Sequence, residues 1–225
     1  KTYVDIVLGP DSYRKLPNIL KRSLKNNQSI VDTKLSRYEV YEGLFPKRKN
    51  GVNAWISIMR GCDKFCTFCI VPFTRGRERS RSVDDIKKEA QDAVKSGYRE
   101  LTLLGQNVNS FKDNANKFHN LLEIIAQIPG VDRIRYTSPH PQDISDQLLE
   151  VMRKYDNICN YIHLPLQSGS DRILKRMHRS YSKDDFLNLA KKIRKKLPDV
   201  GISTDIIVGF PGETEEDFLE TIGVM

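Results

Sequence analysis

The sequence predicts an α/β fold in which parallel strands alternate with helices. Short apolar runs alternate along the chain with amphipathic segments of helical period, and each apolar run ends in a polar or glycine-containing loop. A full hydrophobic core is expected, because 39% of the 225 residues are hydrophobic and 29% are charged. Such alternation forms either an open doubly wound sheet or a parallel (β/α) barrel, and both carry the site at the carboxyl ends of the strands.

The apolar runs place five strands, and capping signals help to place the helices between them. The strands are expected at 54–59, 99–104, 133–137, 161–166 and 202–208. Ser82, Ser182 and Thr214 each precede an aspartate by three positions, a pattern typical of a capped helix N-terminus. The helices are therefore expected at 83–96, 121–128, 144–152, 183–197 and from 215 onward.

A polar or glycine-containing loop follows each of the five expected strands. In chain order these loops carry Cys62, Gly105-Gln106-Asn107, Ser138-Pro139-His140, 167–170 and 209–213. Any one of them is ordinary turn chemistry. Because the carboxyl ends of parallel strands meet at one edge, however, the five loops together predict a site there.

Three of the four cysteines lie within eight residues, as Cys62, Cys66 and Cys69. A 4Fe-4S cubane is normally held by four thiolates, so three would leave one iron open to another ligand. Zinc would need a remote fourth ligand, since the nearest histidine is His119 and the remaining cysteine is Cys159. Cys159 is expected to be a small buried residue. Few cysteines and no secretory signal disfavour disulfides and indicate a cytoplasmic protein without a membrane segment.

The formal net charge of +8 is unevenly distributed. One basic segment, 191–196, is explained as the solvated outer face of a helix. The other follows the cysteines closely and contains four arginines, so it is the better candidate for contact with a polyanion. These arginines are Arg75, Arg77, Arg79 and Arg81.

The C-x3-C-x-aromatic-C pattern of Cys62, Cys66, Phe68 and Cys69 resembles the hallmark of the radical S-adenosylmethionine (radical SAM) enzymes. Further segments are similar to the MiaB-type tRNA methylthiotransferases of that superfamily: 57–62, 71–81, 103–109 and 163–171. The likeness covers nearly the whole chain, because 4–10 resembles the end of that family's preceding domain. It implies a partial parallel (β/α) barrel of the radical SAM type, truncated after about five strands.

The resemblance also implies the cofactors. Cys62, Cys66 and Cys69 would hold a 4Fe-4S cluster whose open iron binds the amino and carboxylate groups of SAM. Reductive cleavage of SAM would give a deoxyadenosyl radical that abstracts hydrogen from the substrate adenine. No catalytic residue is expected beyond the cluster and SAM. The residues implied at the SAM adenine are Phe68, Ile207, Val208 and Gly209, those at its methionine amino group are Gly105, Gln106 and Asn107, and those at its ribose are Gln167 and Ser168.

The implied reaction adds a methylthio group to N6-prenylated (isopentenyl or dimethylallyl) adenosine next to the anticodon in tRNA. The implied partners are tRNA, contacted by the four arginines, and a flavodoxin-like or ferredoxin-like electron donor. Two alternatives stay open. One is a methylthiotransferase for threonylcarbamoyl-adenosine tRNA, and the other is a zinc-stabilised RNA-binding module without catalysis.

The resemblance divides the chain into two parts. Residues 1–45 are expected to be a remnant of the N-terminal methylthiotransferase domain plus a linker, and 46–225 an incomplete radical SAM core. The family's second 4Fe-4S cluster, expected in the full-length protein, has no ligands here, and neither is the C-terminal TRAM domain visible. The chain is therefore expected to be truncated at both ends.

Overall fold

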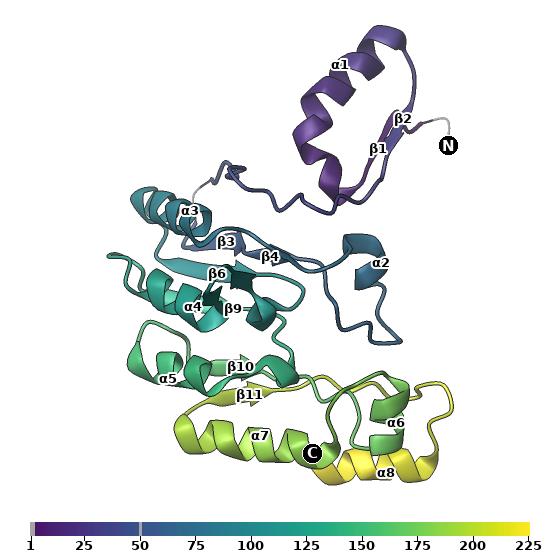
Figure 1. The fold of residues 1–225 in the computed structure, drawn as a ribbon, viewed down its shortest axis with the longest axis vertical. Coiled ribbons are helices and arrows are strands. Elements are labelled where there is room, and N and C mark those ends of the chain that lie inside the picture. Colours follow the sequence, from purple (N-terminus) through teal and green to yellow (C-terminus); the bar gives the residue numbers. More distant parts are fainter. Residues whose placement is uncertain (1–2, 50) are drawn as a thin grey trace.

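The computed structural model describes residues 3–49 and 51–225. Its main part is a stack of parallel strands with helices along one face, and a smaller unit at the N-terminus lies at the end of the stack (Figure 1). The strands are β3 (Asn53–Ser57), β6 (Glu100–Leu104), β9 (Arg133–Tyr136), β10 (Tyr161–His163) and β11 (Gly201–Ser203). β3, β6 and β9 pair in parallel, as do β10 and β11, and a parallel bridge from Ile134 to Ile158 links the two groups. The five predicted strands and their parallel pairing are confirmed.

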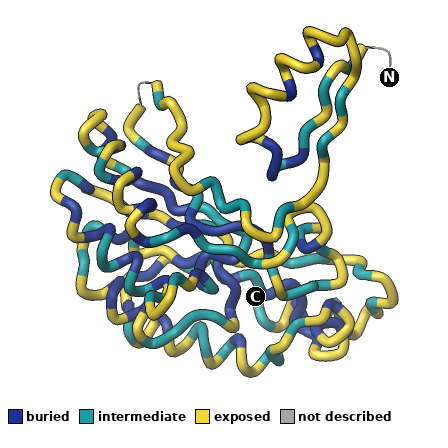
Figure 2. The backbone as a smooth tube through the Cα atoms, turned by 45° about the horizontal axis from the view of Figure 1, so that its top comes forward, coloured by how far each residue is buried: buried dark blue, intermediate teal, exposed yellow. Residues whose placement is uncertain are grey.

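Alternation along the strands decides which face is covered. In β3, Ala54 and Ile56 are buried whereas Trp55 between them is 57% exposed. The covered face packs on the apolar sides of four helices that lie between successive strands (Figures 1 and 2). These are α3 (Val83–Lys95), α4 (Phe118–Ala126), α5 (Asp146–Lys154) and α7 (Lys183–Lys196).

Shorter elements complete the main part. They are β4 (Met59–Arg60), α2 (Val71–Arg75), β5 (Arg79–Ser80), η2 (Val108–Ser110), β7 (Lys112–Asp113), β8 (Asn116–Lys117), η3 (Pro141–Asp143), α6 (Asp171–Arg176) and α8 (Glu215–Val224). None of the helices within 3–49 and 51–225 is both long enough and apolar enough to cross a bilayer.

The three helix starts predicted from capping residues are confirmed, with one difference in the capping, whereas the helices predicted to begin at 121 and 144 begin at Phe118 and Asp146. Ser182 and Thr214 form reciprocal capping boxes with the aspartates three positions on. Ser82 accepts the expected hydrogen bond from the Asp85 backbone, but the box is not closed. The reason is that the Asp85 carboxylate binds Arg81 instead.

The last two strands are shorter than predicted, although the segments 161–166 and 202–208 still run side by side. Leu164 N still donates to the Ser203 carbonyl at 2.7 Å, but Leu166 N donates to the Thr204 side-chain oxygen at 2.9 Å, so the backbone ladder is interrupted there. Beyond it the chains meet again through Gln167, whose N–H donates to the Asp205 carbonyl at 2.8 Å and whose carbonyl accepts from Ile207 N at 2.9 Å.

The N-terminal unit is a parallel pair, β1 (Ile6–Leu8) and β2 (Ile30–Asp32), connected by η1 (Pro10–Lys15) and α1 (Leu16–Asn26). It is anchored to the main part through the buried Asp11, which pairs with Arg60 of β4 at 2.6 Å and with Arg79 of β5 at 3.6 Å. Residues 1 and 2 of the first predicted part and residue 50 of the second lie outside the described residues. The division at 45/46 therefore stays a prediction.

Candidate active site

The segment that carries the cysteines is a loop closed at its base by the antiparallel pair β4 and β5. At the base, Cys62 N donates to the Gly76 carbonyl at 3.2 Å. Gly61 has φ +78°, and a Cβ there would lie 2.1 Å from the Arg77 carbonyl oxygen. Only glycine fits this position, because the backbone is left-handed and the opposite side of the loop is in contact with it. We call residues 61–78 the cysteine loop.

Cys62, Cys66 and Cys69 are free thiols of intermediate burial on this loop. Burial raises the pKa of Cys62 to about 11, so its thiolate needs a cation beside it. Among the residues that the structure describes, no three ligating side chains are gathered closely enough to hold a metal ion. The three thiols share one short loop but would have to turn toward one another on metal binding.

Cys159 was expected to be buried, and this is wrong. Its exposure is intermediate, because it lies on the uncovered face of the strands. There it lines a cavity of about 180 Å³ together with Trp55, Arg135 and Tyr161. It is not part of the cysteine loop.

The loop after β6 lies against the base of the cysteine loop. Gln106 Oε1 accepts the Gly61 N–H at 2.7 Å. Asn107 is buried, and its Nδ2 donates to Glu78 at 3.2 Å and to Asp143 at 2.9 Å, whereas its Oδ1 is buried without a partner. An unpaired buried acceptor is costly, so this oxygen fits a ligand that brings an N–H donor.

A guanidinium that sequence reasoning missed lies against the middle of the cysteine loop. Arg179 Nη1 is 3.6 Å from Cys66 Sγ and 2.7 Å from His140 Nε2. Its guanidinium carbon lies 5.6 Å from the ring centroids of both Phe68 and Tyr181. The His140 loop had been recognised as a strand-end loop, but nothing in the sequence around Arg179 indicated that it would reach Cys66.

A cavity of about 410 Å³ opens beside these groups. Its lining residues are Asp63, Lys64, His140, Gln142, His178, Arg179 and Ser180. Burial, with Arg179 and Lys64 nearby, lowers the pKa of His140 to about 3. The imidazole is therefore neutral near pH 7. Phe68, predicted to lie at the SAM adenine, is 40% exposed and free to pack against a ligand.

The strand-end loops of β10 and β11 meet as predicted, but one residue points elsewhere. Gln167 is held at φ +73° by its backbone bonds to the β11 segment. Ser168 is fully buried, and its hydroxyl faces Thr221 of α8 at 3.4 Å. The Ser168 side chain therefore packs against α8, and the placement of residue 168 at the SAM ribose stays a prediction.

The segment 207–209 borders the same edge. Ile207 is half-buried, and its N–H donates to the Gln167 carbonyl. Val208 is 64% exposed. Gly209 has φ +74° with open space at its Cβ position, and its N–H donates to Glu213. An apolar ligand surface beside 207–209 is sterically possible.

The four candidate arginines divide into two pairs. Arg75 and Arg77 are exposed, and Arg77 forms a surface ion pair with Asp63 at 2.7 Å. The Arg79 side chain is only 8% exposed and pairs with Asp11, and that of Arg81 is 2% exposed. The prediction that Arg79 and Arg81 face a polyanion is wrong, because the fold itself supplies their counterions.

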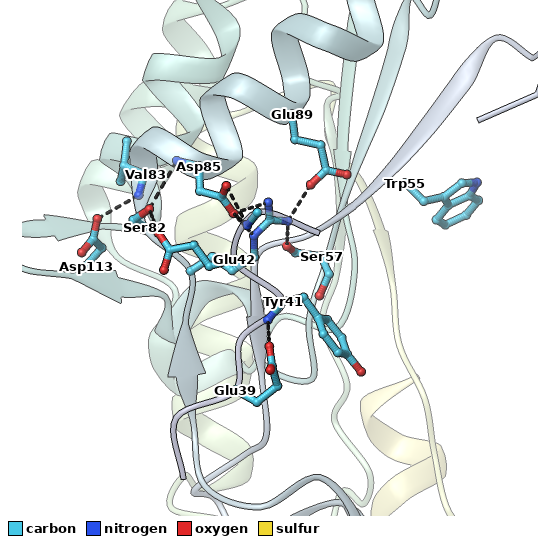
Figure 3. A network of polar contacts seen from close by, with 12 residues as sticks. Glu39, Tyr41, Glu42, Trp55, Ser57, Ser82, Val83, Asp85, Glu89 and Asp113 are labelled. Atoms are coloured by element: carbon cyan, nitrogen blue, oxygen red, sulfur yellow. Dashed lines mark hydrogen bonds and ion pairs between the residues drawn. The ribbon is translucent and has the colours of Figure 1, made fainter. Parts of the chain in front are cut away.

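Arg81 in particular is built into the base of the cysteine loop. Its guanidinium lies 2.6 Å from Asp85 and 2.6 Å from Glu89, and it donates to the Ser57 carbonyl at 2.7 Å. Figure 3 shows Asp85 and Glu89 on one face of α3, turned toward Ser57. The sequence contained a signal for this role, because Asp85 and Glu89 lie four residues apart on one side of a helix and Arg81 lies just before its N-cap.

The fold and the loop agree with comparisons to known proteins. Residues 56–225 match the Radical SAM superfamily. Among solved structures, the apo cobalamin-dependent S-adenosylmethionine radical enzyme OxsB aligns with a TM-score of 0.69 over 96% of this chain and 34% of that chain, at 14% identity. At that identity the likeness concerns the fold, and the predicted partial barrel is confirmed.

Two curated relatives are much more similar in sequence. The chain is 50% identical over 98% of its length to the tRNA-2-methylthio-N(6)-dimethylallyladenosine synthase of Clostridium tetani (strain Massachusetts / E88). It is 47% identical over its whole length to the protein of the same name from Acetivibrio thermocellus (strain ATCC 27405). The chain spans about half the length of these relatives, 49% and 48%.

Proposed function

Because the chain belongs to the radical SAM superfamily, we propose that it is the core of an enzyme that methylthiolates N6-dimethylallyladenosine in tRNA. The observation that carries this proposal is the 50% identity, over nearly the whole chain, to a synthase of that modified nucleoside. The cysteine loop and its unpaired polar atoms supply a site for the chemistry. Since the relatives are about twice as long, the complete reaction belongs to the whole protein that contains this chain.

The residues of the cysteine loop fit a 4Fe-4S cluster. Cys62, Cys66 and Cys69 would be its ligands, and they leave one iron for SAM. When bound, the cluster supplies the electron that cleaves SAM to a deoxyadenosyl radical. The Asn107 Oδ1 would accept a hydrogen bond from the methionine amino group, which would satisfy its unpaired lone pairs.

The remaining SAM contacts follow from the strand-end loops. Phe68 and 207–209 offer apolar surface for the adenine. Gln106 holds the base of the cysteine loop through the Gly61 N–H, and Gly105 lies so close to Met59 that a Cβ there would be 2.7 Å from its Sδ. Gln167 lies where the β10 and β11 loops meet and would face the ribose. Ser168 takes a different part: it fixes this loop to α8 through Thr221.

The substrate and partners are proposed on the same basis. Arg75 and Arg77 are exposed cations within the cysteine loop, so they would contact tRNA phosphates. The electron would come from a flavodoxin-like or ferredoxin-like donor, in the cytoplasm. Threonylcarbamoyl-adenosine tRNA is the alternative substrate, and the names of the relatives favour the dimethylallyl form.

The test is a product assay on the full-length protein after anaerobic reconstitution with iron and sulfide. The protein is incubated with SAM, reductant and tRNA carrying either dimethylallyl-adenosine or threonylcarbamoyl-adenosine, and nucleosides are analysed by mass spectrometry. We expect a methylthio product from the dimethylallyl substrate only. A product from the threonylcarbamoyl substrate alone would reassign the substrate. If the protein bound zinc and no iron, the proposed enzyme activity would be wrong, and the chain would be assigned as a zinc-stabilised RNA-binding module.

A further inference from the structure

We propose that Arg179 is an electrostatic partner of the iron–sulfur cluster: its guanidinium donates a hydrogen bond to the Cys66 sulfur and raises the cluster's reduction potential. This inference rests on the proposed function only in requiring that the cysteine loop hold a cluster. Arg179 is here a positioning residue that acts through Cys66.

The first observation is that Arg179 has no carboxylate. The other half-buried or buried arginines near the loop each have one: Arg60 and Arg79 pair with Asp11, and Arg81 pairs with Asp85 and Glu89. Within 3–49 and 51–225, no ion pair includes Arg179, and its Nε is buried without a hydrogen-bond partner. A partly buried cation without a counterion is costly unless a bound group supplies the negative charge.

The second observation is the chemistry of its neighbours. The Arg179 guanidinium can only donate, so His140 Nε2, 2.7 Å away, must accept. The Gln142 N–H also faces His140, at 3.3 Å from Nδ1. A neutral imidazole has only one ring nitrogen that can accept a hydrogen bond. The shorter distance assigns the accepting nitrogen to Nε2, which faces Arg179. Arg179 is thus held by a neutral acceptor and two aromatic rings, and Cys66 is the one neighbour that becomes anionic on binding iron.

The third observation is that the chain just before Arg179 is fixed to the cysteine loop on both sides of Cys66. Thr67 N donates to the Met177 carbonyl at 3.2 Å, and Thr67 Oγ1 donates to the Arg176 carbonyl at 2.9 Å. His178 Nδ1 lies 3.0 Å from the Phe65 carbonyl. These bonds on both sides of Cys66 hold Arg179 against its sulfur, so the contact is a property of the fold.

The consequence follows from charge. Reduction adds one electron to the cluster, so the reduced form is more negative and gains more from a nearby cation than the oxidised form does. Hydrogen bonds to cluster sulfurs and local charge are established determinants of cluster potential. The neutral state of His140 matters here, because a carboxylate in its place would cancel the charge of Arg179. The cation therefore favours acceptance of the electron that the reaction needs.

The experiment is a redox titration of the reconstituted protein, monitored by electron paramagnetic resonance without SAM or tRNA. Arg179→Gln, which keeps an N–H donor but loses the charge, should lower the midpoint potential. Arg179→Lys should stay nearer to wild type. The control is Lys175→Gln, which removes one exposed charge from the end of α6 and should leave the potential unchanged.

An unchanged potential in Arg179→Gln, with weaker SAM binding by calorimetry, would overturn the proposal and assign Arg179 to the SAM carboxylate. If Arg179→Gln fails to bind iron, the wild-type protein supplies the test. Exchange into D2O should shift its iron–thiolate stretching bands in resonance Raman spectra, and unshifted bands would refute the hydrogen bond. Neither titration nor spectrum uses tRNA, so their failure leaves the proposed reaction standing. If the wild-type protein bound no iron after reconstitution, both the role of Arg179 and the proposed reaction would be refuted.

Discussion

Arg81 and Arg179 are two guanidinium groups at the same cysteine loop, and their surroundings differ in kind. Arg81, at the end of the loop, lies within 2.6 Å of both Asp85 and Glu89. Arg179, at the middle of the loop, lies against a thiol and a neutral imidazole. An arginine that serves the fold has its counterion built into the fold, whereas one that serves a site leaves its counterion to be brought by the ligand. That criterion separates the buried Arg79 and Arg81 from Arg179, whereas the exposed Arg77 pairs with Asp63 at the surface of the loop.

The largest expected effect is the loss of the cluster when any one of its three cysteine ligands is removed, including Cys66, which Arg179 faces. Changing Cys62, Cys66 or Cys69 individually to Ser should abolish iron binding and the brown colour after anaerobic reconstitution. Cys159→Ser is the matched control and should keep about four irons per chain, as for one cubane. Loss of iron in Cys159→Ser, with its circular dichroism unchanged, would contradict the assignment of three ligands.

A second change tests the structural arginine. Arg81→Met leaves the buried Asp85 without a counterion and Glu89 with Arg48 alone, so it should destabilise the protein by about 3–5 kcal/mol. Urea denaturation of the cluster-free protein measures this. Arg75→Met, at an exposed position, should change the stability by no more than about 0.5 kcal/mol. Equal losses in the two variants would remove the distinction between built-in and exposed arginines.

The base of the loop can be disturbed without changing any charge. Gly61→Ala places a Cβ against the Arg77 carbonyl at a left-handed backbone position, so strain should open the loop. We expect a lower melting temperature and several-fold less bound iron. Gly223→Ala in α8 is the control, because nothing lies within 4 Å of its Cβ and alanine favours the helix. Full iron binding by Gly61→Ala would show that the loop tolerates opening.

The smallest effect concerns the exposed pair. Changing Arg75 and Arg77 to Gln should flatten the plot of log tRNA affinity against log salt by about one for each lost phosphate contact. Arg153→Gln on α5, also exposed, serves as the control and should leave the slope unaltered. An unaffected slope in the double variant would assign Arg75 and Arg77 to a solvated surface.

Local patterns predicted the elements well. The capping residues Ser182 and Thr214, the positions of the strands and the strand-end loops were all readable from the sequence, because each depends on neighbours a few positions away. The burial of Arg81 could also have been read, since both of its acidic partners follow on the same helix face.

The remaining features could not be predicted because they depend on distant segments. Ser168 is buried by Thr221, 53 positions away, and Arg179 reaches Cys66 across 113 positions. Nothing local marks either contact. A sequence can indicate that a strand-end loop belongs to the site, but which of its side chains turns inward is decided by the elements that pack behind it.

The claim on which the rest depends is that the cysteine loop holds a cluster with an iron open to SAM. The most direct measurement is the electron paramagnetic resonance spectrum of the reconstituted, reduced protein before and after addition of SAM. We expect the signal of a reduced 4Fe-4S cluster whose g-values change when SAM binds the open iron. A protein that takes up no iron, or a cluster signal that SAM leaves unaltered, would contradict it.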